Sequence, residues 1–338
     1  MEACLIVTYR CNARCRMCHT WQPSNRAVAE FQPALVDKLP ADLQFINITG
    51  GEPFLRKDLD RIIEIALTKT RRLIISTNGF FTRKILSTAK RFGNRIGLRI
   101  SLEGLPAVND HVRGIPEGFD RGLRTLLHLR EMGLSDIGFG MTVSDWNIGD
   151  VTALYQLSKS MGVEFATAVV HNSFYFHKFD NALSEPDAAA HALESIAVDQ
   201  FTSARPKNWF RAYFNMGLVN RIRGGARPLP CDAGTDMFFL DPRGRILPCN
   251  GSEHPLVMGD LHQQSFAEIW SSRRAKSVRR DVCSCSRQCW MIGSAAPAMK
   301  RSIRIPLKWI IRNKWRCLHR RQGPTQLEPV GYVKRQTN

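Results

Sequence analysis

Three cysteines near the N-terminus, Cys11, Cys15 and Cys18, most constrain what this chain can fold into. Three thiolates within eight residues must surround one object, and they are one ligand short of a closed tetrahedral zinc set. A [4Fe-4S] cube held by three cysteines leaves one iron open to an external molecule. His19 would complete a set of four zinc ligands, so zinc is the alternative. The spacing favours an open iron–sulfur site.

The distribution of the remaining cysteines supports metal binding. The ten cysteines form two groups, at residues 11–18 and 231–289, and only Cys4 and Cys317 lie outside them. The N-terminus lacks the basic start and long apolar stretch of a signal peptide, and no run approaches a membrane span of roughly 18 apolar residues. We therefore expect a cytoplasmic protein, in which clustered cysteines indicate metal rather than disulfides.

Strand and helix patterns alternate six times in the first 170 residues. The predicted strands are residues 4–8, 45–49, 73–77, 97–102, 138–143 and 163–170. Buried strands joined by crossover helices form parallel sheets, so we predict an α/β fold, a partial (β/α)6 TIM-like barrel, over residues 1–205. A helix is expected at about 185–203, at the end of this domain, and a helical connection follows over residues 206–230, with a helix at about 208–223.

Polar and glycine-rich segments follow the predicted strands. The cysteine loop follows the first strand, and the next three strands precede or contain Gly50-Gly51-Glu52-Pro53, Asn78-Gly79 and Glu103-Gly104. The carboxyl ends of parallel strands meet at one end of a barrel, where active sites are built. These segments are therefore predicted to form one site.

The CxxxCxxC spacing together with the Gly-Gly-Glu-Pro segment resembles the radical S-adenosylmethionine (SAM) enzymes. The resemblance implies that Cys11, Cys15 and Cys18 hold a [4Fe-4S] cluster, and that residues 50–53 meet the amino group of SAM. It also implies that the cluster reduces SAM, releasing a 5′-deoxyadenosyl radical that abstracts a hydrogen atom from the substrate. A reductase such as a flavodoxin or ferredoxin would supply the electron.

Further SAM contacts are implied by position in the family pattern. Four of them lie on or after the third and fourth strands: Thr77, Asn78, Ser101 and Glu103. Arg113 would pair with the SAM carboxylate, with a surface arginine as the alternative. The residue before the third cysteine is usually aromatic in the family and is Met17 here, whose polarizable sulfur can still pack on adenine.

The second cysteine group predicts a small domain over residues 231–292, with a hairpin turn at 241–244. Its order of motifs resembles the auxiliary-cluster domains called SPASM and twitch, and five thiols suffice for one cluster, which makes twitch the closer match. The resemblance implies a second [4Fe-4S] cluster on four cysteines: Cys231, Cys249, Cys285 and Cys289. Cys283 is a substitute for Cys285, and a structural zinc site is the alternative.

Residues 293–338 form a basic tail. From residue 300 onward it has 11 Lys plus Arg and one acid, Glu328, which is +10 of the total charge of +18. Basic residues recur every fourth position from Lys300 to Arg320, and the opposing helical face is formed by Leu307, Ile310, Ile311, Trp315 and Leu318. We favour packing of the apolar face on the protein. Contact of residues 300–321 with an anionic membrane or another polyanion is the alternative. Nucleic acid is disfavoured because no nucleic-acid module accompanies the helix.

The segment after the sixth strand holds the candidate substrate residues. His171 and Lys178 are predicted proton acceptors for a substrate radical. We expect hydrogen abstraction from a small-molecule or glycan-like metabolite. Peptide modification is the alternative, disfavoured because the chain begins at the first strand with no leader-binding module before it. A zinc-stabilised protein that binds nucleic acid or membrane is the rival from another class.

Overall fold

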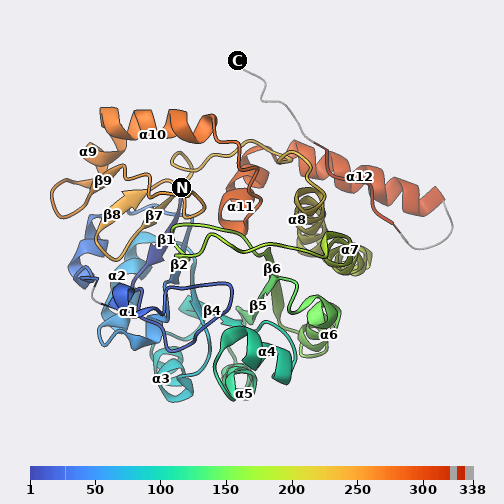
Figure 1. The fold of residues 1–338 in the computed structure, drawn as a ribbon, viewed down its shortest axis with the longest axis horizontal. Coiled ribbons are helices and arrows are strands. Elements are labelled where there is room, and N and C mark those ends of the chain that lie inside the picture. Colours follow the sequence, from blue (N-terminus) through green and yellow to red (C-terminus); the bar gives the residue numbers. More distant parts are fainter. Residues whose placement is uncertain (27, 320–325, 332–338) are drawn as a thin grey trace.

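The computed structural model describes residues 1–26, 28–319 and 326–331, and it contains one nine-stranded sheet in the order β6-β5-β4-β3-β2-β1-β7-β8-β9 (Figure 1). The pairs from β6 to β7 are parallel, whereas β8 and β9 are antiparallel. The strands are β1 Glu2–Ile6, β2 Phe45–Thr49, β3 Leu73–Thr77, β4 Ile96–Ser101, β5 Ile137–Val143, β6 Glu164–Val169, β7 Met237–Leu240, β8 Arg245–Leu247 and β9 Gly259–Asp260. The predicted parallel α/β architecture is confirmed.

Helices alternate with the first six strands and then accumulate toward the C-terminus (Figure 1). The α-helices are α1 Pro23–Arg26, α2 Leu59–Lys69, α3 Thr82–Phe92, α4 Pro106–Arg113, α5 Gly118–Glu131, α6 Val151–Ser160, α7 Pro186–Thr202, α8 Pro206–Ile222, α9 Phe266–Ser271, α10 Arg273–Cys283, α11 Ile292–Arg301 and α12 Arg304–His319. The 3-10 helices are η1 Pro33–Lys38, η2 Pro53–Leu55, η3 Gly93–Arg95 and η4 Ile148–Asp150. Ile62, Ile63 and Ala66 of α2 are buried, which is the inward stripe expected of a crossover helix.

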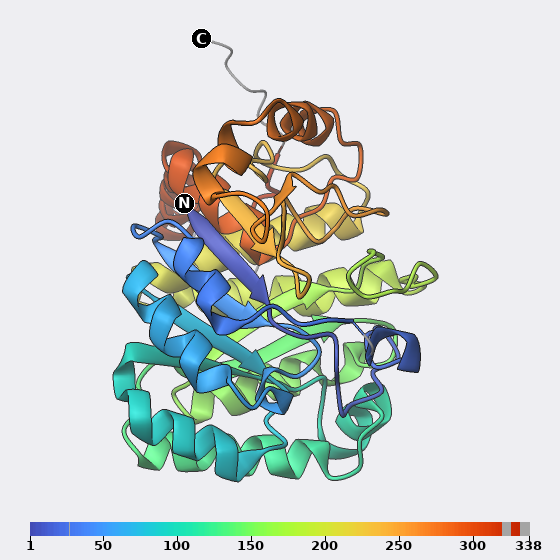
Figure 2. The same cartoon turned by 90° about the vertical axis from the view of Figure 1, so that its left-hand side faces the viewer.

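The strand after the second cysteine group joins the barrel sheet. Residues Glu2 to Leu5 of β1 align with Met237 to Leu240 of β7 in parallel, and β7 is buried along its whole length. An unpaired first strand would expose its backbone hydrogen-bonding groups, and β7 supplies their partners. Figure 2 shows the C-terminal elements gathered beside the N-terminal strand, at the opposite end of the molecule from α4 and α5. The predicted hairpin is confirmed as β7 and β8.

Trp290 attaches the C-terminal segment to α8, one of the helices that follow the barrel. Its side chain is fully buried, stacks near Phe214 and donates from Nε1 to the Phe214 carbonyl at 2.9 Å. Because Trp290 directly follows Cys289, this contact also positions the last cysteine of the second group.

The basic tail differs from the single amphipathic helix that we predicted. It breaks at Ser302 into α11 and α12, and α12 buries Trp309, Ile310 and Asn313. We predicted that the apolar face packs on the protein, but three of its residues, Leu307, Ile311 and Trp315, are exposed, so the prediction was wrong for them. The helix is turned this way because Trp309 packs against the rings of Phe201 and Tyr213, which we call the aromatic socket. Residues 320–325 and 332–338 of the tail, and the side chain of Leu318, lie outside the described residues.

Within the residues that the structure describes, no helix is both long enough and apolar enough to cross a bilayer.

Candidate functional site

The first cysteine loop leaves β1 and runs along the C-terminal end of α4. The backbone N–H groups of Arg14 and Arg16 donate to the carbonyls of Arg113 and Val112, both at 2.9 Å, and Cys18 N–H donates to the Cys15 carbonyl at 3.2 Å. These bonds hold the loop of the three cysteines against the end of α4.

The thiols of the cysteine loop influence one another electrostatically. Burial, followed by the neighbouring charges of Cys15 and Glu52, raises the pKa of Cys11 to about 12. Burial and Cys15 raise the pKa of Cys18 to about 11. Buried thiolates become stable near neutral pH when a metal centre supplies compensating positive charge. Among the described residues, no three His, Cys, Asp or Glu side chains are close enough to hold a single metal ion. A set of three thiols fits a cluster with one open iron, whereas a closed zinc site needs a fourth ligand, for which His19 is the candidate.

Two glycines allow the second strand's loop to approach the cysteine loop. Gly51 N–H donates to the Thr8 carbonyl and Glu52 N–H to the Arg10 carbonyl, both at 2.8 Å. A Cβ atom at Gly51 would lie 2.2 Å from the Arg10 carbonyl oxygen, and one at Gly50 would lie 2.4 Å from that of Thr8. Only glycine permits such close backbone contact.

Glu52 connects three of the predicted segments. Its carboxylate is fully buried and accepts hydrogen bonds from Phe54 N–H at 3.1 Å, Thr77 Oγ1 at 2.8 Å and Asn78 N–H at 2.8 Å. Burial raises the pKa of Glu52, and these three donors oppose the rise. The Glu52 and Thr77 side chains thus bind each other, while Pro53 begins η2 and is buried.

Arg113 and Glu103 form a buried ion pair at the end of α4 that contacts the cysteine loop. Arg113 Nη1 is 3.0 Å from Glu103 Oε1, and Glu103 Oε2 accepts a bond from Thr142 N–H at 2.7 Å. Arg113 is 9% exposed, so the surface interpretation of this arginine was wrong. Although burial lowers the pKa of Arg113, the nearby Cys15 and Glu103 raise it above its usual value. The guanidinium is therefore a permanent cation beside the thiols.

Two side-chain donors, Arg113 Nε and Asn12 Nδ2, are buried without a hydrogen-bond partner among the described residues. Buried donors of this kind cost free energy unless a ligand accepts from them. Asn12 was missed by the sequence analysis, although it lies inside the cysteine motif. Its Oδ1 accepts from Asn78 Nδ2 at 2.8 Å, which joins the third strand to the cysteine loop. The two orphaned donors fit an anionic or carboxylate-bearing ligand.

Of the remaining predicted SAM contacts, Met17 lies within the cysteine loop and Ser101 lies at the carboxyl end of β4. Met17 is buried and packs with Val112 and Val170 beside Cys15 and Cys18. Ser101 ends β4 and is half-buried, opposite Gly140 in the sheet.

The structure brings part of the segment after β6 to the cysteine loop. Asn181 Nδ2 donates to the Met17 carbonyl at 3.1 Å, and Tyr175 Oη donates to the Gly50 carbonyl at 2.7 Å. Asn181 also escaped prediction, because an isolated asparagine far from any motif gives no signal in a sequence.

The two predicted proton acceptors have different surroundings. Burial, and then the positive charge of Arg221, lowers the pKa of His171 to about 4, so its imidazole is neutral at pH 7. Its Nε2 is buried without a partner among the described residues. Lys178 instead forms an ion pair with Asp180 at 2.7 Å. His171 therefore offers a neutral ring with an unpartnered nitrogen near pH 7, whereas Lys178 is engaged by Asp180.

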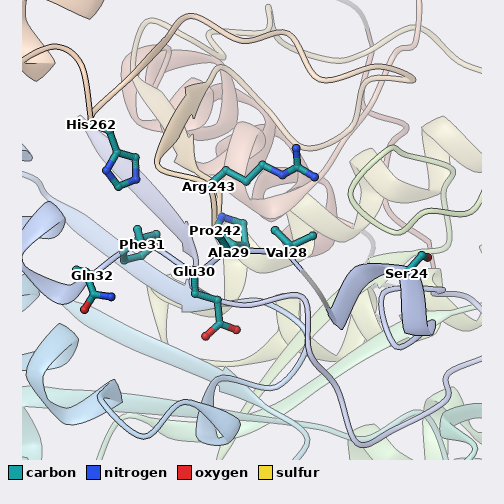
Figure 3. Close-up of a pocket in the computed structure, with 9 residues that line it drawn as sticks. All are labelled: Ser24, Val28, Ala29, Glu30, Phe31, Gln32, Pro242, Arg243 and His262. Atoms are coloured by element: carbon teal, nitrogen blue, oxygen red, sulfur yellow. The ribbon is translucent and has the colours of Figure 1, made fainter.

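A hollow of about 810 Å3 lies where the segment after α1 meets the β7–β8 turn (Figure 3). Glu30, Phe31 and Arg243 are among the residues that line it. Glu30 receives a two-bond contact from Arg10, with both nitrogen–oxygen distances 2.8 Å, so the hollow borders the start of the cysteine loop. None of its lining residues is one of the predicted site residues.

The second cysteine group converges on a buried arginine. Cys231 and Cys289 contribute to the raised pKa of Cys249, which burial brings to about 11. Arg227 is buried, and the charges of Cys231, Cys289 and Cys285 act on its guanidinium, whose pKa burial lowers. Cys283 is the exposed last residue of α10. Cys285 is exposed as well, so the four-cysteine set that includes it, with Cys283 as its substitute, stays a prediction.

Two family models match the chain. The model of the radical SAM superfamily matches residues 5–157, and the model of the SPASM iron–sulfur cluster-binding domain matches residues 231–290. The second match has the SPASM name, one of the two related domain types that the cysteine pattern suggested.

Curated relatives span most of the chain at modest identity. Pre-heme d1 synthase of Dinoroseobacter shibae is 26% identical over 325 residues, covering 83% of this chain and 78% of that protein. Mycofactocin maturase MftC of Mycobacterium ulcerans is 23% identical, covering 79% and 73%. Fe-coproporphyrin III synthase of Methanosarcina barkeri is 34% identical over 158 residues, but the match spans only 39% of that protein.

Solved structures share the fold. The structure titled native anSMEcpe with bound AdoMet superposes with a TM-score of 0.62 at 14% identity, covering 92% of this chain and all of that one. Streptococcus suis SuiB also gives 0.62, at 14% identity, covering 86% and 72%. The partial-barrel prediction is therefore confirmed as a fold.

Proposed function

Because the chain belongs to the radical SAM superfamily and contains a SPASM iron–sulfur domain, we propose that it abstracts a hydrogen atom from a small-molecule metabolite and so oxidises or modifies it. The chain is a radical SAM enzyme, whose radical SAM domain binds a [4Fe-4S] cluster and SAM. Its SPASM domain implies an auxiliary iron–sulfur cluster. When bound, the first cluster and SAM together supply the one-electron chemistry that produces a hydrogen-abstracting radical.

One observation supports this proposal most strongly: Cys11, Cys15 and Cys18 are half-buried and all interact electrostatically with Arg113, whose Nε is buried without a hydrogen-bond partner among the described residues, as is Asn12 Nδ2. In the proposal, Cys11, Cys15 and Cys18 hold the cluster. Arg113 Nε and Asn12 Nδ2 then donate to SAM, while Glu103 holds the guanidinium in place. Gly50 and Gly51 keep the neighbouring loop close enough to complete the cavity.

The second half of the proposed site handles the substrate. His171 is neutral at pH 7 and has an unpartnered Nε2, so it can accept a proton when a substrate radical is oxidised. Lys178 is held by Asp180 and serves better to attract an anionic substrate than to take a proton. Cys231, Cys249, Cys285 and Cys289 would hold the auxiliary cluster, which can accept the electron. A flavodoxin or ferredoxin is the proposed reductant for the first cluster.

The relatives direct the choice of substrate. The names of two of them, Fe-coproporphyrin III synthase and pre-heme d1 synthase, indicate tetrapyrrole chemistry, which is small-molecule modification. A tetrapyrrole with anionic side chains would also suit residues 1–299, which carry the remaining +8 of the net charge. A glycan-like metabolite is a second form of the same proposal.

A peptide substrate is the second candidate. Mycofactocin maturase MftC supports it by its name, and its match extends over 79% of this chain.

The test begins with protein reconstituted without oxygen. We expect about eight irons per chain, as two [4Fe-4S] clusters require, and release of 5′-deoxyadenosine on addition of reductant and SAM. Iron-coproporphyrin III, glycans and peptides are then compared for their effect on nucleoside formation and for transfer of substrate deuterium into the nucleoside. A His171→Phe variant should retain SAM cleavage and lose product formation.

Zinc with neither iron nor nucleoside formation would refute the enzyme assignment in favour of a zinc-stabilised binding protein. Deuterium transfer from a peptide alone would refute the small-molecule proposal.

A further inference from the structure

The C-terminal helix α12 has three different faces. One face is buried: Trp309 lies between Phe201 and Tyr213, with ring centroids 5.6 Å and 5.5 Å apart, and its indole nitrogen donates to the Glu328 carbonyl at 3.0 Å. Lys314 strengthens this attachment by donating to the Phe201 carbonyl at 2.7 Å. The helix is therefore anchored to α7 and α8 along one side, and its orientation is set (Figure 1).

A row of large apolar side chains lies on the outward side. The row comprises Ile303, immediately before the helix, and Leu307, Ile311 and Trp315, and we call it the apolar stripe. Leu307 is 39% exposed, Ile311 67% and Trp315 59%. Residues four apart lie on one side of a helix, so these side chains form a continuous strip. Four such exposures in line on an anchored helix indicate a binding surface, whereas single exposed apolar residues do not.

A row of cations runs beside the stripe, one residue further along at each step. This basic row consists of Arg304, Lys308, Arg312 and Arg316. Glu328 pairs with Arg316 at 2.7 Å and more loosely with Arg312 at 3.4 Å. In the part of the chain that the structure describes, no ion pair occupies Arg304 or Lys308. The outward side thus presents apolar surface and unneutralised positive charge together.

We propose that α12 docks the protein on an anionic lipid bilayer, with the apolar stripe entering the headgroup region and the basic row meeting the lipid phosphates. An interfacial helix needs both an apolar side and flanking Lys or Arg, with Trp at the boundary. Both are present here, and the helix is held in place by its third face.

Other binding partners would not match both the apolar stripe and the basic row. Nucleic acid would pair with the basic row and leave the apolar stripe exposed to water. If a second copy of the chain bound through its own α12, it would bring no negative charge to the basic row, because α12 contains no acidic residue. A bilayer with anionic lipid matches the stripe and the row at once.

Vesicle flotation of the reconstituted full chain tests this proposal. We use vesicles of phosphatidylcholine alone, or with about 30% phosphatidylglycerol. The protein should float with the anionic vesicles, remain in solution with the neutral ones, and be released as salt screens the lipid charge. A double variant, Ile311→Ser with Trp315→Ser, should reduce the bound fraction by ~10-fold or more, since it removes half of the stripe.

Matched variants separate the surface from general effects. Met132 is 41% exposed on the C-terminal end of α5, and Met132→Ser should bind vesicles like the unaltered protein. Arg304→Glu with Lys308→Glu should abolish binding, whereas Lys90→Glu with Arg124→Glu, which makes the same change of charge on α3 and α5, should leave most of it. Iron content and melting temperature verify that each variant folds.

A second measurement reports the depth of Trp315. Its emission, taken as the difference between the protein and a Trp315→Phe variant, should shift to the blue on anionic vesicles. Equal binding to neutral vesicles, unchanged flotation of the stripe variant, or a Trp315 signal that vesicles do not move would each overturn the proposal. So would dimerisation through α12 in sedimentation velocity. Binding is read without SAM or substrate, so this result is independent of the proposed reaction.

Discussion

A buried arginine lies beside each of the two cysteine groups, but their charges are balanced differently. Arg113 pairs directly with the Glu103 carboxylate at 3.0 Å. Arg227 directs its hydrogen bonds to neutral oxygens, namely the carbonyls of Leu229 and Cys289 and both oxygens of Ser294. The first site therefore holds an ion pair next to three thiols, and the second holds a cation whose direct partners are uncharged.

This difference fits two different tasks. An open cluster that binds SAM benefits from a local environment that is close to neutral, because the ligand carries charges of its own. A cluster held by four cysteines has no external ligand, and a nearby cation favours its more negative, reduced state. The second environment is thus suited to accepting an electron.

The largest expected effect separates the two groups by their cysteines. Cys15→Ala should remove the first cluster and abolish 5′-deoxyadenosine formation, with about four irons remaining per chain. Cys285→Ala should damage only the auxiliary site, so SAM cleavage persists while product formation fails. Cys283→Ala is the matched control and should retain about eight irons.

Iron analysis and nucleoside assays check these three variants. Loss of auxiliary iron in Cys283→Ala but not in Cys285→Ala would reverse the ligand assignment.

The next effect concerns the ion pair at the first site. Arg113→Met leaves the Glu103 carboxylate buried and unpaired, so the free energy of unfolding should fall by about 3–5 kcal/mol. The double variant Arg113→Met with Glu103→Met should recover much of this loss, because no isolated charge remains. Urea denaturation of the three proteins measures it. A double variant as unstable as the single one would show that the pair is not what Arg113 contributes.

Glycines at the two sites should differ in tolerance. Gly51→Ala places a methyl group 2.2 Å from the backbone oxygen of Arg10, and we expect a loss of about 1–3 kcal/mol together with a large increase in the KM for SAM. At the second site, Gly251→Ala meets the flexible end of Met291 at 2.9 Å, which can move aside.

Melting temperatures and SAM kinetics compare the two glycine variants. Equal losses would indicate that both loops are packed equally tightly.

The smallest effect is electrostatic. Replacing Arg227 with Met should lower the midpoint potential of the auxiliary cluster by on the order of 50 mV, and Arg227→Lys should restore part of it because the charge returns. Potentiometric titration followed by electron paramagnetic resonance measures the shift, which a purely structural role would not produce. The potential of the first cluster should stay unchanged, and equal shifts in both clusters would contradict the comparison.

Much of the barrel could be predicted from local sequence patterns. The predicted ranges for β2 and β3 match the structure residue for residue, since both strands are short apolar runs bounded by polar segments. β1 begins two residues earlier than predicted, at Glu2, because Glu2 pairs with Phe45 of β2 and Met237 of β7; its buried carboxylate binds Lys300 of α11. The sequence alone does not indicate that a charged residue such as Glu2 belongs to a strand, because its ion-pair partner Lys300 lies far away in the chain.

The chain's own sequence determined the first site and the fold class. The three cysteines lie within eight residues, and the rule that parallel strands align their carboxyl ends places the Gly-Gly-Glu-Pro segment beside them. Only the tertiary structure decided that Arg113 binds Glu103, that β7 extends the barrel sheet at β1, and that α12 turns Trp309 inward and Trp315 outward. These choices depend on partners distant in the chain. Helical periodicity shows that a helix has an apolar side, but the aromatic socket of Phe201 and Tyr213 selects which residues are buried.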